Sequence, residues 1–121
     1  MKQDRQLVGK LRHLKSAADV LCQADEVKMA AAAEKVRRIE AQIYELRKQL
    51  TTPLGTEQGT QEIFVTARHR VWIERGLRAL NLELSQAAAQ RELAKDTLAR
   101  TSGRKEVLHK LIKKQIRYPA G

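Results

Sequence analysis

The sequence has few of the residues that build compact globular cores. Its 121 residues include one Trp, one Phe and two Tyr, so that aromatics make up 3% of the chain. Aromatic side chains normally supply much of the buried area of a globular core. Helix breakers are scarce as well, with two Pro and six Gly. The chain is long enough for one domain at most, and a globular core rich in aromatics is not expected.

Cysteine and long apolar segments are also scarce. Cys22 is the single cysteine, so no disulfide can form within the chain, and the sequence suits a reducing compartment. No apolar run reaches the roughly 20 residues that span a bilayer. No apolar stretch typical of a secretion signal follows Met1 to Arg5. These absences predict a cytoplasmic protein.

Helix-forming residues dominate instead. Ala, Leu, Glu, Lys, Arg and Gln lose little side-chain freedom in a helix. Helix breakers cluster in one segment, Thr51 to Gly59, which holds one of the two prolines and two of the six glycines. The sequence therefore predicts an all-α protein, a single long antiparallel two-helix coiled-coil hairpin over residues 1–121. Its helices are expected at about 4–50 and 61–117, with a turn at about 51–60.

Heptad spacing, in which apolar residues alternate steps of three and four, supports the coiled coil. In the first helix the pattern holds at Ala32, Val36, Ile39, Ile43, Leu46 and Leu50. Upstream, Leu7, Leu11, Leu14 and Ala18 have the same spacing. This stretch joins the first through Cys22, Asp25 and Met29 only if an extra step of four, a stutter, lies between Ala18 and Cys22. In the second helix it runs through Ile73, Leu77, Leu80, Leu84, Ala87, Arg91, Ala94, Leu98, Thr101, Lys105, Leu108 and Ile112.

The expected pairing of the two helices follows from the position of the turn. Counting outward from Gly55 along both helices places Cys22 near Ala88 and Trp72 near Arg38. The second helix is the longer one, so its C-terminal end is expected to extend beyond the first helix at the open end of the hairpin.

Positive charge gathers at that open end. The chain has 24 Lys and Arg against 14 Asp and Glu, a formal charge of +10. Residues 1–15 carry +4 and residues 104–121 carry +5. The second segment also places Leu108, Leu111, Ile112 and Ile116 at helical spacing, which predicts an unpaired apolar stripe available to bind another surface. An acidic protein ring, an anionic membrane or nucleic acid would each fit.

Catalytic and metal-binding patterns are missing. The three histidines do not form HExxH or HxxxH spacing, and neither GxGxxG nor GxxxxGK[ST] is present. Cys22 lies at a seam position without an adjacent basic residue, which favours a small core residue over a nucleophile. We therefore expect no enzymatic activity, no catalytic residue, no metal site and no cofactor.

Two aromatic residues are candidate binding residues. Trp72 lies next to Ile73, and Tyr44 next to Ile43. Trp72 either covers the seam near the turn, with Arg37 or Arg38 over its ring, or is an exposed anchor for a partner. Tyr44 has the same two interpretations, a residue that covers the seam or an exposed anchor for a partner, and the sequence leaves both open.

A family resemblance adds to these expectations. It rests on a break followed by Val71-Trp72-Ile73, on the repeat Leu77, Leu80 and Leu84, and on the closing pattern Leu98-Ala99-Arg100, Arg104-Lys105, Val107-Leu108 and Leu111. In these features the sequence resembles the FliJ family of flagellar type III protein export, which is related to the stalk proteins of virulence type III secretion. The resemblance covers the last fifty residues or so best.

The resemblance implies a stalk similar to the rotor shaft of F- and V-type ATPases. Such a stalk inserts into a hexameric export ATPase (FliI-like), promotes its assembly and ATP turnover, and links it to an export gate protein (FlhA-like). It reaches the membrane only through partners. The residues that would enter the ATPase are Arg5, Lys10, Arg12, Lys15, Arg104, Lys105, Leu108, Lys110, Ile112, Lys113, Lys114 and Arg117. The gate would face Tyr44 and Trp72.

Two other functions remain open. The first is a generic coiled-coil adaptor or chaperone, whose spare apolar stripes form a four-helix bundle. The second is non-specific nucleic-acid binding. A basic-zipper protein places its basic region before a parallel zipper, whereas the strongest basic run here follows the coil, which makes nucleic acid the weaker alternative.

Overall fold

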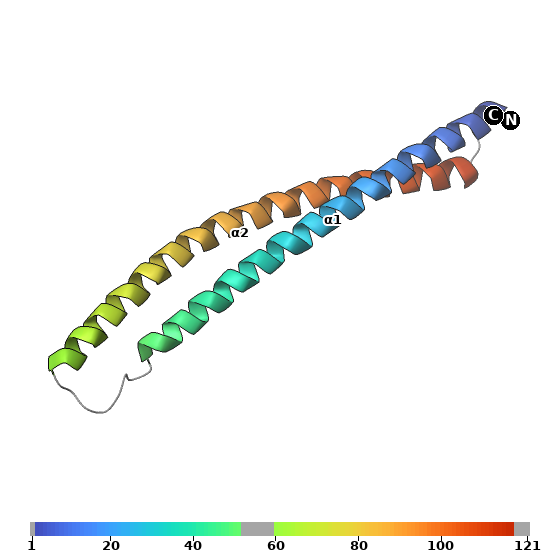
Figure 1. Cartoon of the computed structure of the whole chain (residues 1–121). Helices are drawn as coiled ribbons and strands as arrows, with labels where there is room; N and C mark the ends of the chain where they lie inside the picture. Colours follow the sequence, from blue (N-terminus) through green and yellow to red (C-terminus); the bar gives the residue numbers. More distant parts are fainter. Residues whose placement is uncertain (1, 52–59, 118–121) are drawn as a thin grey trace. The chain divides into compact units, whose positions relative to one another are not determined.

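The computed structural model describes residues 2–51 and 60–117, which form two helices, α1 (Lys2–Thr51) and α2 (Thr60–Arg117). The helices pack against each other as a hairpin (Figure 1), and the described residues include no strand. The predicted all-α two-helix fold is confirmed. Apart from Thr51 and Thr60, the turn expected at 51–60 lies outside the described residues.

The chain divides into two compact units, each built from a stretch of both helices. We call Met1–Ala31 with Glu92–Gly121 the terminal unit, and Ala32–Arg91 the central unit. In the terminal unit Asp19 lies near Lys105 and Cys22 lies beside Thr101, so numbers rise along α1 as they fall along α2. The helices are therefore antiparallel.

The central unit holds the apolar core. Val36, Ile39 and Ile43 of α1 are buried together with Ala87 of α2. Leu77, Leu80 and Leu84 pack against this cluster from α2. Ile73, one heptad step before Leu77, is 1% exposed. Burial of this apolar area is the main favourable contribution to the pairing of the helices, since each helix alone would leave its stripe in water.

The seam of α1 is a regular heptad repeat without a stutter. Its buried and partly buried positions are Asp4, Val8, Leu11, Lys15, Ala18, Cys22, Asp25, Met29, Ala32, Val36, Ile39, Ile43, Leu46 and Leu50. The sequence-based assignment through Leu7 and Leu14 was wrong, because these leucines are 41% and 57% exposed. The regular repeat keeps one face of α1 towards α2 and places Val8 and Lys15, rather than Leu7 and Leu14, in the seam.

The seam of α2 follows the sequence-based prediction. All twelve expected positions from Ile73 to Ile112 are buried or partly buried, although Arg91, Thr101 and Lys105 are polar. The pattern continues one step further, to Gln115. Long aliphatic stems allow Arg and Lys to occupy such positions while their charged ends reach water.

The register of the pairing differs from the prediction. Cys22 lies beside Thr101, not Ala88. In the central unit, a Cβ built on Gly76 would come within 2.9 Å of Leu46 Cδ2, so Leu46 lies against Gly76. The prediction was wrong because it assumed that residues at equal distances from Gly55 in the two helices lie opposite each other. Instead, the first turns of α2 extend beyond the last residue of α1, and pairing begins near Ile73.

Two glycines of α2 are expected to respond differently to replacement by alanine. A Cβ at Gly103 meets nothing within 4 Å, so Gly103→Ala is expected to raise the free energy of unfolding by about 0.5–1 kcal/mol through better helix propensity. At Gly76 the same gain is offset because Leu46 must move. Urea denaturation followed by circular dichroism measures both variants. The packing described here is contradicted if Gly76→Ala gains more stability than Gly103→Ala.

Candidate partner-binding surfaces

The terminal unit carries most of the positive charge. Its sequence contains 14 Lys and Arg against seven Asp and Glu, a formal charge of +7 out of the +10 of the whole chain. Most of the basic residues predicted to bind a partner are exposed here: Arg5, Lys10, Arg12, Arg104, Lys110, Lys113, Lys114 and Arg117. They come from both helices, because antiparallel pairing brings the two basic segments into one unit.

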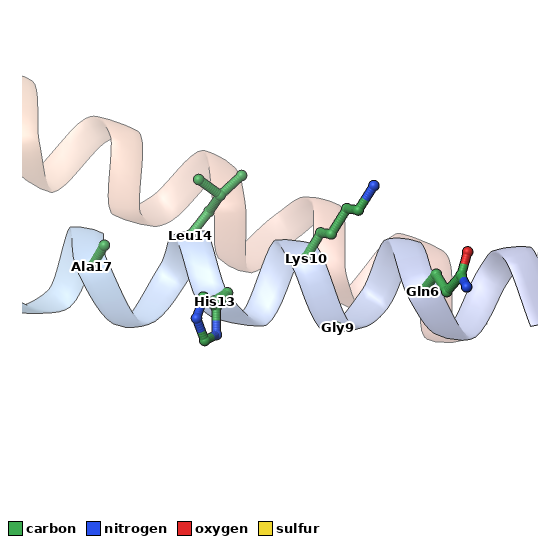
Figure 2. Close-up of a pocket in the computed structure, with 6 residues that line it drawn as sticks. All are labelled: Gln6, Gly9, Lys10, His13, Leu14 and Ala17. Carbon is green, nitrogen blue, oxygen red and sulfur yellow. The ribbon is translucent and has the colours of Figure 1, made fainter.

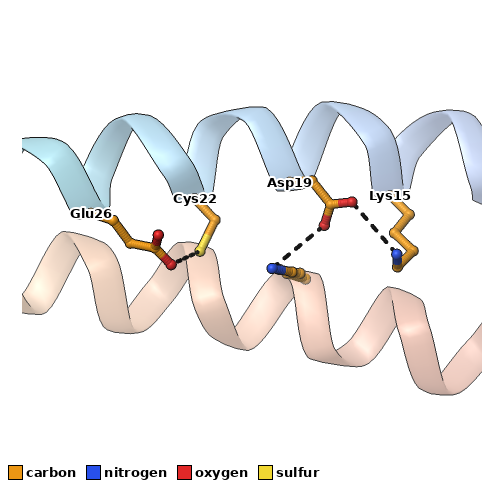
Figure 3. A network of polar contacts seen from close by, with 5 residues as sticks. Lys15, Asp19, Cys22 and Glu26 are labelled. Carbon is orange, nitrogen blue, oxygen red and sulfur yellow. Dashed lines mark hydrogen bonds and ion pairs between the residues drawn. The ribbon is translucent and has the colours of Figure 1, made fainter.

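Two of the predicted basic residues lie in the seam instead. Lys15 Nζ is 3.5 Å from Asp19 Oδ2, and Lys105 Nζ is 3.8 Å from Asp19 Oδ1 (Figure 3). One carboxylate thus interacts with a lysine from each helix. A polar layer of this kind is best satisfied in one register. We therefore assign Lys15 and Lys105 to the pairing of the helices, because the ammonium group of each lies within ion-pair distance of Asp19.

The stripe expected at the C-terminal end of α2 is unpaired at only two of its four residues, because Leu111 and Ile116 are exposed. Ile112 is 7% exposed and Leu108 is partly buried, because both lie in the seam with α1. For these two residues the prediction was wrong for the same reason as the register, since α2 has a partner along residues 105–115. The large apolar side chains that are exposed in the terminal unit are Leu7, Leu14, Val20, Leu21, Val27, Leu93, Val107, Leu111 and Ile116.

Cys22 is a core residue of the terminal unit. Its side chain is buried, and its Sγ donates to Glu26 Oε1 over 3.6 Å (Figure 3). Burial raises the pKa of the Cys22 thiol, and the hydrogen bond to Glu26 raises it further, while Lys105 and Thr101 act in the opposite direction. A thiol kept protonated in this way is a poor nucleophile.

The two candidate aromatics are exposed in the central unit. Trp72 is 62% exposed and stacks on His69 of its own helix, with the ring centroids 5.9 Å apart. The Trp72 ring therefore stacks on His69, and not on Arg37 or Arg38 as one of the two interpretations expected. Trp72 lines an open hollow of about 370 Å³ together with Ala67, Arg68, Val71 and Arg75. Tyr44 is exposed too, with Lys48 Nζ 5.6 Å from its ring centroid.

Neither aromatic therefore covers the seam. An exposed Trp beside two arginines is typical of a protein-binding surface, since Trp and Arg are enriched among the residues that dominate binding energy. Trp72 and Tyr44 come from different helices of the central unit, but no contact between them is seen.

The described residues were also searched for a metal site and for a membrane-spanning segment. Within residues 2–51 and 60–117, no group of three or more His, Cys, Asp or Glu side chains is arranged to hold a metal ion. Neither of the two described helices has a segment long and apolar enough to cross a membrane. No family model, curated protein or solved structure matches the sequence or the fold.

Sequence reasoning missed the seam positions Val8 and Lys15, and with Lys15 the polar layer that it forms with Asp19 beside the seam. A signal was available. Continuing the alternation of three and four backwards from Ala32 leads through Met29, Asp25 and Cys22 to Ala18, Lys15 and Leu11 without a break. This frame was overlooked because the exposed Leu7 and Leu14, each one position before a true seam residue, give a more apolar pattern.

Proposed function

We propose that this chain is a non-enzymatic stalk of a flagellar or related type III protein-export apparatus. The observation that carries the proposal is an antiparallel two-helix coiled coil whose terminal unit exposes Lys and Arg from both helices. The resemblance to the FliJ family supports the same function. In this proposal the terminal unit engages a hexameric export ATPase, and the exposed aromatics of the central unit contact an export gate protein.

Charge and shape suit such a stalk. A +7 unit attracts a ring whose inner surface carries acidic residues, and long-range attraction of this kind raises the association rate. A two-helix coiled coil exposes side chains around its whole circumference, which allows contacts with every subunit of a surrounding ring. ATP hydrolysis belongs to the partner. The chain would act in the cytoplasm, peripheral to the inner membrane through its partners.

A coiled-coil adaptor or chaperone is the second candidate. The nine exposed large apolar side chains of the terminal unit favour it, because they offer more area than a purely electrostatic contact needs. The two functions differ in the partner that is captured. Non-specific nucleic-acid binding ranks below both, and would be recognised by a steep loss of duplex binding with salt.

Charge reversal in the terminal unit tests the proposal. Lys110, Lys113 and Lys114 are exposed, and of their contacts only the Lys110–Glu106 pair at 3.4 Å is affected by replacement with Glu. Each replacement is therefore expected to change the free energy of unfolding by no more than about 0.5 kcal/mol. Binding of the export ATPase is expected to weaken by about tenfold or more, mainly through a slower association rate. Affinity capture and stimulated ATP turnover measure the effect.

A matched control changes the same amount of charge in the central unit. Arg38, Arg47 and Arg78 are exposed there, and their combined replacement by Glu leaves the terminal unit intact. The control variant is expected to capture the ATPase as the unaltered chain does. The proposal fails if the terminal variant keeps full capture and turnover, or if both variants lose them equally.

A further inference from the structure

A second row of apolar residues runs along α1 in the terminal unit. Leu7, Leu14 and Leu21 lie seven residues apart and are 41%, 57% and 57% exposed. Ala17, Ala24 and Ala31, also seven apart, are exposed between and beyond them. We propose that this Leu–Ala stripe, formed by Leu7, Leu14, Ala17, Leu21, Ala24 and Ala31, is a second coiled-coil seam that binds an acidic amphipathic helix of another protein.

The spacing is that of a seam and not of scattered surface residues. From Leu14 to Ala24 the stripe alternates steps of three and four, as the buried seam of α1 does one position away. Lys10 and Lys28 occupy the two heptad positions where the apolar pattern is interrupted. Val20 and Val27 border the stripe, and both are exposed. The stripe therefore extends the apolar surface of α1 beyond the part that α2 covers.

The stripe is shaped to accept another helix. Alternating leucine with alanine leaves a shallow row into which side chains of a neighbouring helix can insert. An open hollow of about 820 Å³ lies here, lined by Gly9, Lys10, His13, Leu14 and Ala17 among others. Figure 2 shows Leu14, Ala17 and Lys10 leaving the same side of α1, and His13 leaving the opposite side. Small residues permit a close approach of a second backbone.

The charge around the stripe selects an acidic occupant. Lys10 and Lys28 lie within the row, and the positions that border it on the side away from α2, Gln6, His13, Val20 and Val27, contain no Asp or Glu, whereas Asp25 borders it on the side that faces α2. A second copy of this chain would bring the same lysines and the same +7 unit against each other, which disfavours self-association. A helix with Glu or Asp beside its apolar residues would pair with both lysines.

A membrane surface fits less well than a helix. Amphipathic helices that lie on membranes present a broad apolar face, often with Trp or Phe. The stripe is narrow, contains no aromatic residue, and has the period of a helix partner. Lys10 belongs both to the stripe and to the proposed ATPase-binding surface, but the inference can be tested separately, because Lys110, Lys113 and Lys114 lie outside the stripe and Leu14 and Leu21 lie outside that surface.

The test uses a synthetic helical peptide of about four heptads, with Leu and Ala at its seam positions and Glu at the flanking positions. A second peptide has Lys in place of Glu. Fluorescence anisotropy measures binding of each labelled peptide to the full chain at physiological salt. The Glu peptide is expected to bind saturably, and the Lys peptide is expected not to bind.

Variants of the chain separate the stripe from general attraction between charges. Leu14→Gln with Leu21→Gln removes apolar area from exposed positions, so helicity and stability are expected to be retained. Binding of the Glu peptide is expected to weaken at least about tenfold. The control, Leu82→Gln with Leu93→Gln, alters two leucines of α2 that are at least as exposed as Leu14 and Leu21, and it is expected to leave binding unchanged.

Four results would overturn the inference. The first is absence of Glu-peptide binding, and the second is an equal loss in the control variant. The third is that only vesicles of phosphatidylglycerol, and neither peptide, bind the chain in a way that depends on Leu14 and Leu21. The fourth is sedimentation showing that the unaltered chain dimerises through these leucines.

Discussion

Ile73→Ala is expected to lower the free energy of unfolding by about 2–5 kcal/mol. Ile73 is 1% exposed, so truncation removes buried methylene groups and leaves a cavity between the helices. A two-helix hairpin has only a thin core, and its total stability is expected near the lower end of the usual 5–15 kcal/mol or so. The variant should therefore be close to unfolding at room temperature. Urea denaturation followed by circular dichroism gives the value.

The same replacement at Ile116 is the matched control. Ile116 also lies on α2 but is 57% exposed, so Ile116→Ala is expected to change stability by less than about 0.5 kcal/mol. The difference between the two variants reports burial alone, because the side chains removed are identical. A loss below about 1 kcal/mol at Ile73 would mean that the core of the central unit is not packed as described.

Much of the fold could be predicted from the sequence because the strongest signals are local. A single cluster of Pro and Gly, together with strong helix propensity elsewhere, limits the chain to two helices. The seam of α2 was also predictable, since Ile73, Leu77, Leu80 and Leu84 leave one choice of heptad frame. Where apolar residues occupy a single row, periodicity identifies the buried face.

The N-terminal half of α1 could not be predicted in this way because it has two apolar rows. Leu7, Leu14 and Leu21 compete with Val8, Leu11 and Ala18 for the same apparent role. The apolar pattern within this half does not by itself decide which row faces α2, and only continuity with the heptad frame that starts at Ala32 distinguishes the two rows. In the structure the row that contains Val8, Leu11 and Ala18 faces α2, where Lys105 Nζ is 3.8 Å from Asp19 Oδ1 and Thr101 lies beside Cys22.

The register was unpredictable for a related reason. Counting from the turn fixes the pairing only if both helices start pairing where they start in sequence. Here Leu46 lies against Gly76, so the first turns of α2 have no opposite residue on α1. The error placed the unpaired part of α2 at its C-terminal end instead of its N-terminal end. Leu108 and Ile112 were therefore expected to be unpaired, although both are seam residues.

The candidate site was predicted in its charge but not in its apolar part. Net charge can be counted from sequence, and antiparallel pairing of any register brings residues 1–15 and 104–117 into one unit. Which lysines remain exposed depends on the register. Lys113 and Lys114 are exposed, whereas Lys15 and Lys105 are partly buried beside Asp19.

The antiparallel register is the central claim, since the exposed basic residues and the Leu–Ala stripe both depend on it, and a disulfide tests it most directly. In a Thr101→Cys variant, the new thiol lies beside the buried Cys22. Mild oxidation is expected to join the two within one chain. The closed loop should stabilise the fold by about 2–4 kcal/mol, visible as a shift in urea denaturation that reductant reverses.

The comparison variant is Ala88→Cys, the position that counting from the turn places opposite Cys22. Non-reducing electrophoresis of the oxidised monomers measures the yield of the internal crosslink in each variant. The structure predicts a high yield for Thr101→Cys and none for Ala88→Cys. A crosslink with Ala88→Cys but not with Thr101→Cys, or crosslinks only between chains, would contradict it.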